Sequence, residues 1–343
     1  MNIFKSKGWL AATGFLVLAP IAPVGAEGLY HFLKEIPVGG EGGWDYLSVD
    51  EAARRLYVTH ATKVVVIDLE KDTIVGEIAD TQGVHGVALA PKLHRGFVSN
   101  GKEATVSIVD LDTLKTLSKV PTGEKPDAIL FEPGREEVYA FNGTSHSVTI
   151  FAAATGKVVA TTPLSGKPEF ATCDTEAGRV YCNIEDKSEL VAIDTKSHQV
   201  VNTWPIAPGE SASGLAFDVA HHRLFLGCDN KLMVMMDSTN GKVAGSVPIG
   251  EGVDANAFDA GTQLAFSSNG EGNVTIAHED SPDKLTVKDT LVTQPGARTM
   301  ALDPKTHRIY LASAKYDPAD TGKKRRKMLP GSFKVLVYEL TVH

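Results

Sequence analysis

The sequence has little cysteine and, after its first 26 residues, no long apolar run. Its three cysteines, Cys173, Cys182 and Cys228, are too few for a disulfide scaffold. Cys173 and Cys182 are expected on neighbouring strands, so one disulfide and three buried thiols are both compatible with the sequence. A membrane-spanning helix needs about 20 consecutive apolar residues, and no segment of that kind follows residue 26.

Motifs of several enzyme classes are also absent. Residues 209–214 (GESASG) lack the G-x-S-x-G spacing of a nucleophile elbow. The glycine-rich segment 39–43 (GGEGG) precedes a strand pattern, and no Lys-Ser or Lys-Thr follows it. This segment is therefore predicted to be a hinge and not a phosphate loop. No Cys/His pair has the spacing of a zinc finger or a haem attachment site.

The first 26 residues have the pattern of a secretory signal. Lys5 and Lys7 give a positive start, residues 9–23 are mostly apolar, and residues 24–26 (VGA) are small. We therefore predict cleavage after Ala26 and a single domain over residues 27–343. The mature protein is expected to be periplasmic or secreted, with no membrane insertion.

A repeat of 40 to 44 residues runs through the rest of the chain. Each unit has a glycine-containing turn, a short strand, a tight turn and a second strand that begins near an aromatic residue. The equivalent ends of the first strands are Asp50, Ala90, Glu132, Asp174, Asp218, Asp259 and Asp303. This period is typical of β-propeller blades and too long for leucine-rich or ankyrin repeats. No helical period of useful length is present, so we predict an all-β fold.

The second strand of each unit resembles a known family. Residues 57–60 (YVTH), 97–100 (FVSN), 139–142 (YAFN), 181–183 (YCN) and 310–313 (YLAS) resemble the Tyr-Val-Thr-Asn signature of YVTN repeats. The chain as a whole resembles the YncE group of exported β-propellers. This resemblance implies seven blades of four antiparallel strands around a central channel, with functions that vary among members.

The two ends of the chain are expected to close the ring. The last unit, residues 297–338, supplies three strands, whereas residues 29–37 form a strand pattern with no inner strand before it. We predict that this N-terminal strand completes the last blade and protects an open sheet edge. The aromatic residues that recur with the repeat are predicted to pack between blades. They are Tyr57, Phe97, Tyr139, Tyr181, Phe225, Phe266 and Tyr310.

Polar residues recur near the start of every predicted inner strand, five positions before its end. They are Asp45, His85, Asp127, Glu169, Ser213, Asp254 and Arg298. Because inner strands begin at one mouth of the channel, we expect these side chains to form a ring there. The aromatic residues beside the ring positions are Trp44, Tyr46 and Phe170. Second strands are expected to end at the same mouth, with Ile184 interrupting an otherwise mainly polar set. The other members of that set are His60, Asn100, Asn142, Cys228, Asn269 and Ser313.

The ring is compatible with a bound divalent cation or a polar ligand. Its carboxylates are Asp45, Asp127, Glu169 and Asp254. Carboxylates and amide carbonyls suit calcium, magnesium or manganese, whereas participation of His85 or His60 shifts the preference toward zinc or iron. Arg298 offers two parallel N–H groups to a carboxylate or phosphate. The alternative is that these groups only face water in a polar channel.

The last unit contains an insertion between its second and third strands, from Lys315 to about Gly331. Its five consecutive basic residues are Lys323, Lys324, Arg325, Arg326 and Lys327. A lid that attracts an anionic ligand and a solvated loop are both compatible with this insertion. Removal of residues 1–26 lowers the formal charge from −8 to −10, so DNA binding through this loop would be weak and salt-sensitive.

Two classes of function fit the sequence. The first is a monomeric binding or scaffold propeller that presents the channel mouth to a small molecule or a protein. The second is a metal-dependent hydrolase or lyase, similar in architecture to propeller lactonases, with His85 or Asp127 as general base. We favour the first because no reaction-specific motif accompanies the repeat. Nucleic acid is not an expected partner.

Overall fold

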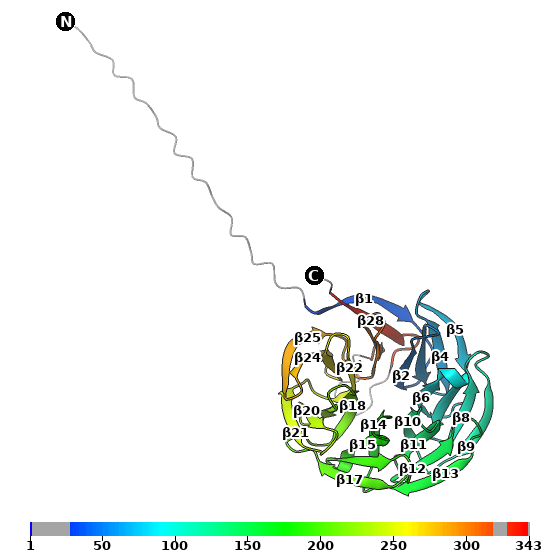
Figure 1. Ribbon diagram of the computed structural model, residues 1–343. Helices are drawn as coiled ribbons and strands as arrows, with labels where there is room; N and C mark the ends of the chain where they lie inside the picture. The colour runs from blue at the N-terminus through cyan, green and yellow to red at the C-terminus, as the bar shows by residue number, and fades with distance from the viewer. Residues whose placement is uncertain (2–27, 318–327, 342–343) are drawn as a thin grey trace.

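The computed structural model describes residue 1 and residues 28–317 and 328–341. Within these residues, seven four-stranded antiparallel sheets form a ring around a central channel (Figure 1). The predicted seven-bladed all-β fold is thus confirmed. The predicted signal segment lies, apart from Met1, outside the described residues. Blade 1 consists of β2 to β5, blades 2 to 6 follow in chain order, and blade 7 consists of β26, β27, β28 and β1.

Every blade has an inner, a second, a third and an outer strand. The inner strands are β2 (Trp44–Asp50), β6 (Val84–Ala90), β10 (Pro126–Glu132), β14 (Pro168–Asp174), β18 (Ala212–Asp218), β22 (Val253–Asp259) and β26 (Met300–Asp303). The second strands are β3 (Arg55–His60), β7 (Arg95–Asn100), β11 (Glu137–Asn142), β15 (Arg179–Ile184), β19 (Arg223–Cys228), β23 (Leu264–Asn269) and β27 (Arg308–Ser313). The third strands are β4 (Lys63–Asp68), β8 (Thr105–Asp110), β12 (Ser147–Ala152), β16 (Glu189–Asp194), β20 (Leu232–Asp237), β24 (Asn273–Ser281) and β28 (Lys334–Leu340). The outer strands are β5 (Thr73–Ile78), β9 (Thr116–Pro121), β13 (Val158–Pro163), β17 (Val200–Pro205), β21 (Val243–Pro248), β25 (Lys284–Val292) and β1 (Tyr30–Pro37).

Helical structure in the described residues is limited to two 3₁₀ turns, η1 (Pro91–Leu93) and η2 (Glu185–Lys187). No described helix has the length and apolarity that a membrane crossing requires.

The acidic residue that ends most inner strands caps the turn to the second strand. Oδ1 of Asp50 accepts the backbone N–H of Ala53 at 2.9 Å, and Oδ1 of Asp174 accepts that of Ala177 at the same distance. Such local bonds stabilise a tight turn. Blade 2 has Ala90 at this position, and there Pro91 starts η1 instead. All seven predicted strand ends are confirmed.

The core lies within and between the blades. Third strands are buried along most of their length because neighbouring sheets cover both faces. The seven repeated aromatic residues are all at most 2 % exposed, so their predicted burial between blades is confirmed. A Tyr30–Phe266 pair shows the contact across a blade boundary, with ring centroids 5.4 Å apart in an edge-to-face arrangement.

Two interactions join the end of the ring to its beginning. Strand β1 pairs antiparallel with β28, from Tyr30 opposite Leu340 to Pro37 opposite Lys334, as predicted. In addition, Arg54 of blade 1 donates two hydrogen bonds to the buried carboxylate of Asp303 in blade 7, at 3.1 and 2.7 Å. The seam is therefore closed both by a sheet and by a bidentate ion pair.

Candidate functional site

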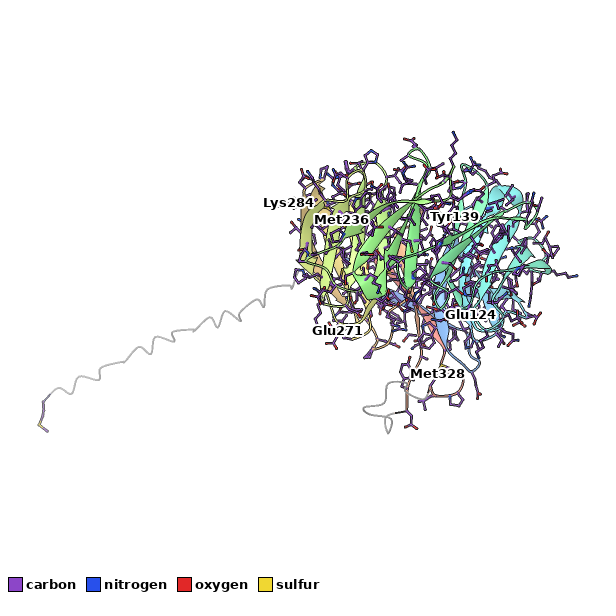
Figure 2. All side chains as sticks on the ribbon, turned by 90° about the horizontal axis from the view of Figure 1, so that it is seen from below. Glu124, Tyr139, Met236, Glu271, Lys284 and Met328 are labelled. Atoms are coloured by element: carbon purple, nitrogen blue, oxygen red, sulfur yellow. The ribbon has the colours of Figure 1, made fainter. Side chains whose placement is uncertain are left out.

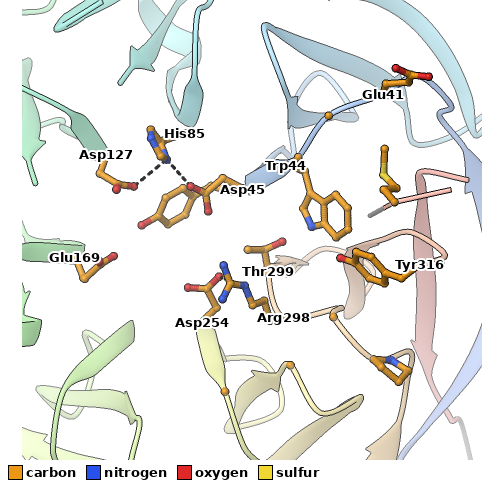
Figure 3. Close-up of a pocket in the computed structure, with 18 of the residues that line it drawn as sticks. Glu41, Trp44, Asp45, His85, Asp127, Glu169, Asp254, Arg298, Thr299 and Tyr316 are labelled. Atoms are coloured by element: carbon orange, nitrogen blue, oxygen red, sulfur yellow. Dashed lines mark hydrogen bonds and ion pairs between the residues drawn. The ribbon is translucent and has the colours of Figure 1, made fainter. Parts of the chain in front are cut away.

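The inner strands open at a cavity of about 1130 Å³ at one mouth of the channel. Six of the seven predicted ring residues line this cavity. They are Asp45, His85, Asp127, Glu169, Asp254 and Arg298. The seventh, Ser213, lies behind the wall and donates a hydrogen bond of 3.2 Å to Oδ1 of Asp254. We call this cavity the cup (Figure 3).

A β-bulge directs these side chains into the cup. In each of blades 1 to 6 the register between inner and second strand shifts at the ring position, for example between Trp44 and Leu47 in blade 1. A bulge leaves residues outside the ladder and changes the direction of their side chains. Blade 7 lacks this bulge because β26 begins only at Met300, after Arg298.

A hydroxyl residue of the second strand holds the bulge in place in blades 1 and 2. Thr59 Oγ1 accepts the N–H of Asp45 and donates to the carbonyl of Tyr46, both at 3.0 Å. Ser99 accepts the N–H of Gly86 at 2.9 Å and donates to the carbonyl of Asp127 in the next blade at 2.7 Å. In blades 1 and 2 the hydroxyl group therefore satisfies backbone groups that the bulge would leave unpaired.

His85 lies between two carboxylates, as the dashed lines in Figure 3 show. Its Nδ1 is 2.6 Å from Oδ2 of Asp45 and 3.2 Å from Oδ1 of Asp127. These three residues offer ligand atoms that all lie within 4.8 Å of one another. The expected carboxylate-only set is therefore revised for the described residues, because the cluster joins Asp45 and Asp127 to a histidine and leaves out Glu169 and Asp254.

The ring carboxylates Asp127, Glu169 and Asp254 each have a lysine or arginine beside them. Lys167 contacts both Glu169 and Glu185, and Nζ of Lys125 lies 3.0 Å from Oδ2 of Asp127. On the other side, Nε of Arg298 lies 2.9 Å from Oδ2 of Asp254, while most of the arginine side chain stays exposed. The guanidinium is thus anchored and still accessible to a ligand.

Burial and mutual repulsion raise the pKa of several cup carboxylates. Burial, together with the charge of Asp127, raises the pKa of Glu169 to about 8, although Lys167 opposes the shift. Burial also raises the pKa of Asp254 to about 7 against the effect of Arg298. The pKa of Asp45 is raised by burial despite its hydrogen bond to His85. The cup therefore favours the protonated form of these carboxyl groups, because burial and neighbouring negative charge disfavour their ionisation.

The pKa of His85 is also raised. Burial opposes protonation of the imidazole, but the hydrogen bond to Asp45 and the charge of Asp127 outweigh that effect.

Aromatic residues form one wall and the floor of the cup. Trp44 stacks on Phe333 with ring centroids 5.0 Å apart and lies beside Tyr316 at 6.4 Å. Tyr46 and Phe170, from blades 1 and 4, meet across the channel with centroids 4.4 Å apart. Because these two rings meet at the channel axis, they form a floor below the ring of charges.

The second-strand residues do not line the cup, which corrects their predicted position. Asn142 Nδ2 donates to Ser147 and Thr149 of its own blade, at 3.1 and 3.0 Å. Asn100 and Asn269 make equivalent bonds within their blades. These buried amides join second to third strands, because the strand end points into the hairpin and away from the mouth.

The other second-strand positions are placed similarly. Cys228 and Ile184 are buried in apolar clusters, and Ser313 contacts Gln294 at 3.2 Å. His60 is buried against Phe333 with ring centroids 4.3 Å apart, and burial lowers its pKa. His60 therefore packs as a neutral ring behind the cup wall.

The glycine-rich hinge has a second role that the sequence analysis did not foresee. Segment 39–43 joins β1 to β2 as predicted, but residues 41–43 also line the cup. Gly40 has a φ of +82°, and a Cβ there would lie 2.8 Å from Cε1 of His60. Only glycine fits this close approach.

Lys125 and Lys167 were missed as cup residues. Each stands two positions before a ring carboxylate, in Lys125-Pro126-Asp127 and Lys167-Pro168-Glu169. Proline starts the inner strand in both blades, and the lysine reaches back to the acid. The repeated K-P-D/E pattern could have identified both lysines.

The insertion in blade 7 is rooted in the cup wall. Tyr316 and Met328 form an isolated bridge, and both line the cavity together with Pro330. The predicted basic lid residues, Lys323 to Lys327, lie outside the described residues.

The three cysteines form no disulfide within the described residues. Cys173 stands opposite Val180, and Cys182 stands opposite Ala171, so the two thiols are out of register on neighbouring strands. Burial raises the pKa of Cys173 to about 11 and that of Cys228 to about 12. The structure thus has three unpaired thiols, of which Cys182 and Cys228 are buried as expected and Cys173 is only partly buried.

Comparisons with known proteins agree with the fold. Neither the family models nor the curated protein sequences give a match to this chain. A chain of hydrazine synthase from Kuenenia stuttgartiensis is similar at 15% identity and a TM-score of 0.69, covering 80% of this chain and 94% of that chain. A chain of the mitotic checkpoint complex is similar at 14% identity and a TM-score of 0.77, covering 97% and 99%. At such identities the similarity shows that this chain has a β-propeller fold.

Proposed function

We propose that this protein is an exported binding propeller that holds a small anionic ligand in the cup, with help from a divalent cation. The observation that carries this proposal is the convergence of Asp45, His85 and Asp127 at one place in a large polar cavity. Propellers of one architecture host unrelated functions, so the fold alone does not select this one.

The three clustered side chains support a cation site. Two carboxylate oxygens and an imidazole nitrogen form a mixed donor set that suits zinc or manganese. The cup also carries more carboxylates than cations along its lining. A bound divalent ion would compensate that excess charge.

The opposite side of the cup supports an anionic organic ligand. Arg298 is held by Asp254 and keeps its remaining N–H groups toward the cavity, where they suit a carboxylate or phosphate. Trp44 and Tyr316 provide an aromatic wall on this side (Figure 3). A ligand that bridges the cation and Arg298 would be fixed at two points.

The test is elemental analysis of dialysed mature protein, together with zinc and manganese titrations. We expect His85→Ala to bind one equivalent of metal less than the unmodified chain. His94→Ala is the matched control because His94 is exposed and pairs only with the exposed Asp112 among described residues. Equal metal content in all three proteins would contradict the cation site.

A hydrolase or lyase at the same cup is a second candidate. His85 lies between two carboxylates at the wall of the cavity, so it could serve there either as a metal ligand or as a general base. Lactone and ester substrates should then be turned over by the metal-loaded chain and not by His85→Ala. Binding of such compounds without turnover would leave the binding propeller as the better account.

A further inference from the structure

Glu279 occupies a buried position that blades 1 to 5 fill with uncharged side chains. The equivalent residues are Leu69, Leu111, Ala153, Thr195 and Ser238. The equivalence follows from a shared backbone hydrogen bond to the first turn of the same blade, as from Leu69 N to Arg54 O and from Glu279 N to Gln263 O, both 2.9 Å. All six residues are at most 5 % exposed. Packing of the repeat therefore does not require a charge at this position.

Glu279 meets two further ligand-type side chains from blade 5. Asp218 ends β18, and His221 stands in the turn that follows. Nδ1 of His221 lies 2.6 Å from Oδ2 of Asp218 and 3.4 Å from Oε1 of Glu279. The three ligand atoms lie within 4.8 Å of one another. At the position of His221 the other blades have Ala53, Leu93, Arg135, Ala177, Thr262 and Thr306.

The carboxylate of Glu279 is only weakly compensated by its neighbours, because the one cationic partner among the described residues is the imidazole of His221 at 3.4 Å. The side chain of Glu279 has no exposed surface, and neither carboxylate oxygen accepts a hydrogen bond from a described residue. The nearby Arg223 is committed elsewhere, because Nε donates to the carbonyl of Pro282 and Nη1 lies 3.2 Å from Asp237. Asp218 accepts the N–H of Ala220 and faces His221. Glu279 has only the same imidazole near it, so the two buried carboxylates share one neutralising group. A bound cation would compensate both of them.

We propose that Asp218, His221 and Glu279 form a divalent metal site, of the zinc class, that ties blade 5 to blade 6. One imidazole nitrogen and two carboxylate oxygens match the ligands of zinc, whereas calcium and magnesium prefer oxygen alone. The partly exposed His221 leaves an entry path and room for water as a further ligand.

This site is separate from the cup. Strand β18 begins beside Ser213 at the cup and ends at Asp218, on the opposite rim of the ring. Figure 2 shows the same separation, with Lys284 at the β24–β25 turn far from Met328 on the cup face. The proposal therefore does not depend on the function proposed for the cup.

The test is a zinc titration of chelator-treated mature chain carrying His85→Ala, so that the cup cluster lacks its histidine. We expect one equivalent of zinc with a Kd of about micromolar or tighter and an increase in Tm on loading. Adding Glu279→Leu, which copies Leu69 and Leu111, should abolish zinc binding while the metal-free Tm stays equal or rises.

A matched pair of histidine variants keeps the test decisive if Glu279→Leu folds poorly. His221→Ala should weaken zinc binding at least tenfold, whereas His222→Ala should not, because the ring of His222 faces Asp174 at 3.7 Å. Zinc binding that persists unchanged in Glu279→Leu and His221→Ala would overturn the proposal. Absence of zinc binding, with a higher Tm in Glu279→Leu, would overturn it too and indicate two carboxyls that share a proton.

Discussion

The two ends of the inner strands differ in how closely the blades repeat each other. At the far rim, six of the seven strand ends are acidic, and several of them cap the same kind of turn. At the cup, the ring positions carry Asp, His, Glu, Ser and Arg in different blades. Repetition at the far rim reflects a local need that every blade has. Divergence at the cup occurs because a bulge points these side chains into a cavity, where packing imposes no common residue.

Glu279 extends this lesson to the far rim. It departs from the repeat at a buried position, and its neighbours His221 and Asp218 complete a set of metal-ligand types. In a repeat protein, a residue that departs from the repeat at a buried position, where packing does not require the change, is thus a candidate for a function.

The largest expected effect is the loss of the seam ion pair. Asp303→Ala should reduce the free energy of unfolding by about 3–5 kcal/mol, because Arg54 keeps a charge in a largely buried place without its partner. Urea denaturation measures the change. Asp112→Ala is the control and should have little effect, since the His94–Asp112 pair is exposed. Similar losses of stability in both variants would contradict the prediction that burial makes the Arg54–Asp303 pair the more stabilising of the two.

The next prediction copies the acidic cluster between blades 5 and 6 onto the boundary between blades 1 and 2. Leu111→Glu places a buried carboxylate near Asp50, as Glu279 lies near Asp218, and should lower the free energy of unfolding by roughly 2–4 kcal/mol. Adding Ala53→His should let zinc restore part of the stability, because the three ligand types then coincide at this boundary too. Calorimetry with and without zinc measures this. If zinc had no effect on stability, the three ligand types alone would not suffice, and the backbone geometry between blades 5 and 6 would be needed as well.

The two rims should also differ in the pH dependence of stability of the metal-free protein. The folded-state pKa of Glu169 is raised to about 8, so its contribution is present at low pH and is lost as the pH rises through about 8. Burial alone would raise the pKa of Asp303, but Arg54, Thr306 and the N–H of Lys305 together lower it, so its contribution is lost as the pH falls.

Unfolding midpoints measured between about pH 2 and 9 test this difference, because the Asp303 contribution is lost only below its ordinary pKa of 3.8. Glu169→Gln should remove the part of the decline that ends near pH 8, leave the part due to Asp254 that ends near pH 7, and leave the acid side unchanged. Asp303→Asn should do the reverse. If Glu169→Gln changed only the acid side, the assignment of the cup charge would be wrong.

The smallest effect is expected at the second-strand amides. Asn142→Ala should lower the free energy of unfolding by about 1 kcal/mol through loss of the bonds to Ser147 and Thr149. Metal content and ligand binding in the cup should not change, because Asn142 is buried in its hairpin. A clear loss of metal or ligand binding would show that Asn142 does contribute to the cup.

Prediction from sequence succeeded where the repeat could be counted. The ends of the inner strands and the closure by residues 29–37 follow from the order of the repeats. The six ring residues of the cup follow from their fixed distance of five residues before each strand end. It failed where a side-chain direction depends on a single residue of register. His60 and Asn142 end their strands beside the mouth, yet the alternation of a strand turns them into the blade.

The sequence by itself determined the seven-bladed fold, because the spacing of turn residues and apolar strands allows few other ways to bury both faces of small sheets. Only the tertiary structure decided which charges meet. His85 joins Asp45 across one blade boundary, and Glu279 joins Asp218 across another, although about 40 and 61 residues separate them in the chain. Such contacts depend on how adjacent blades pack and on where a bulge redirects the backbone. Neither can be predicted from the local sequence pattern.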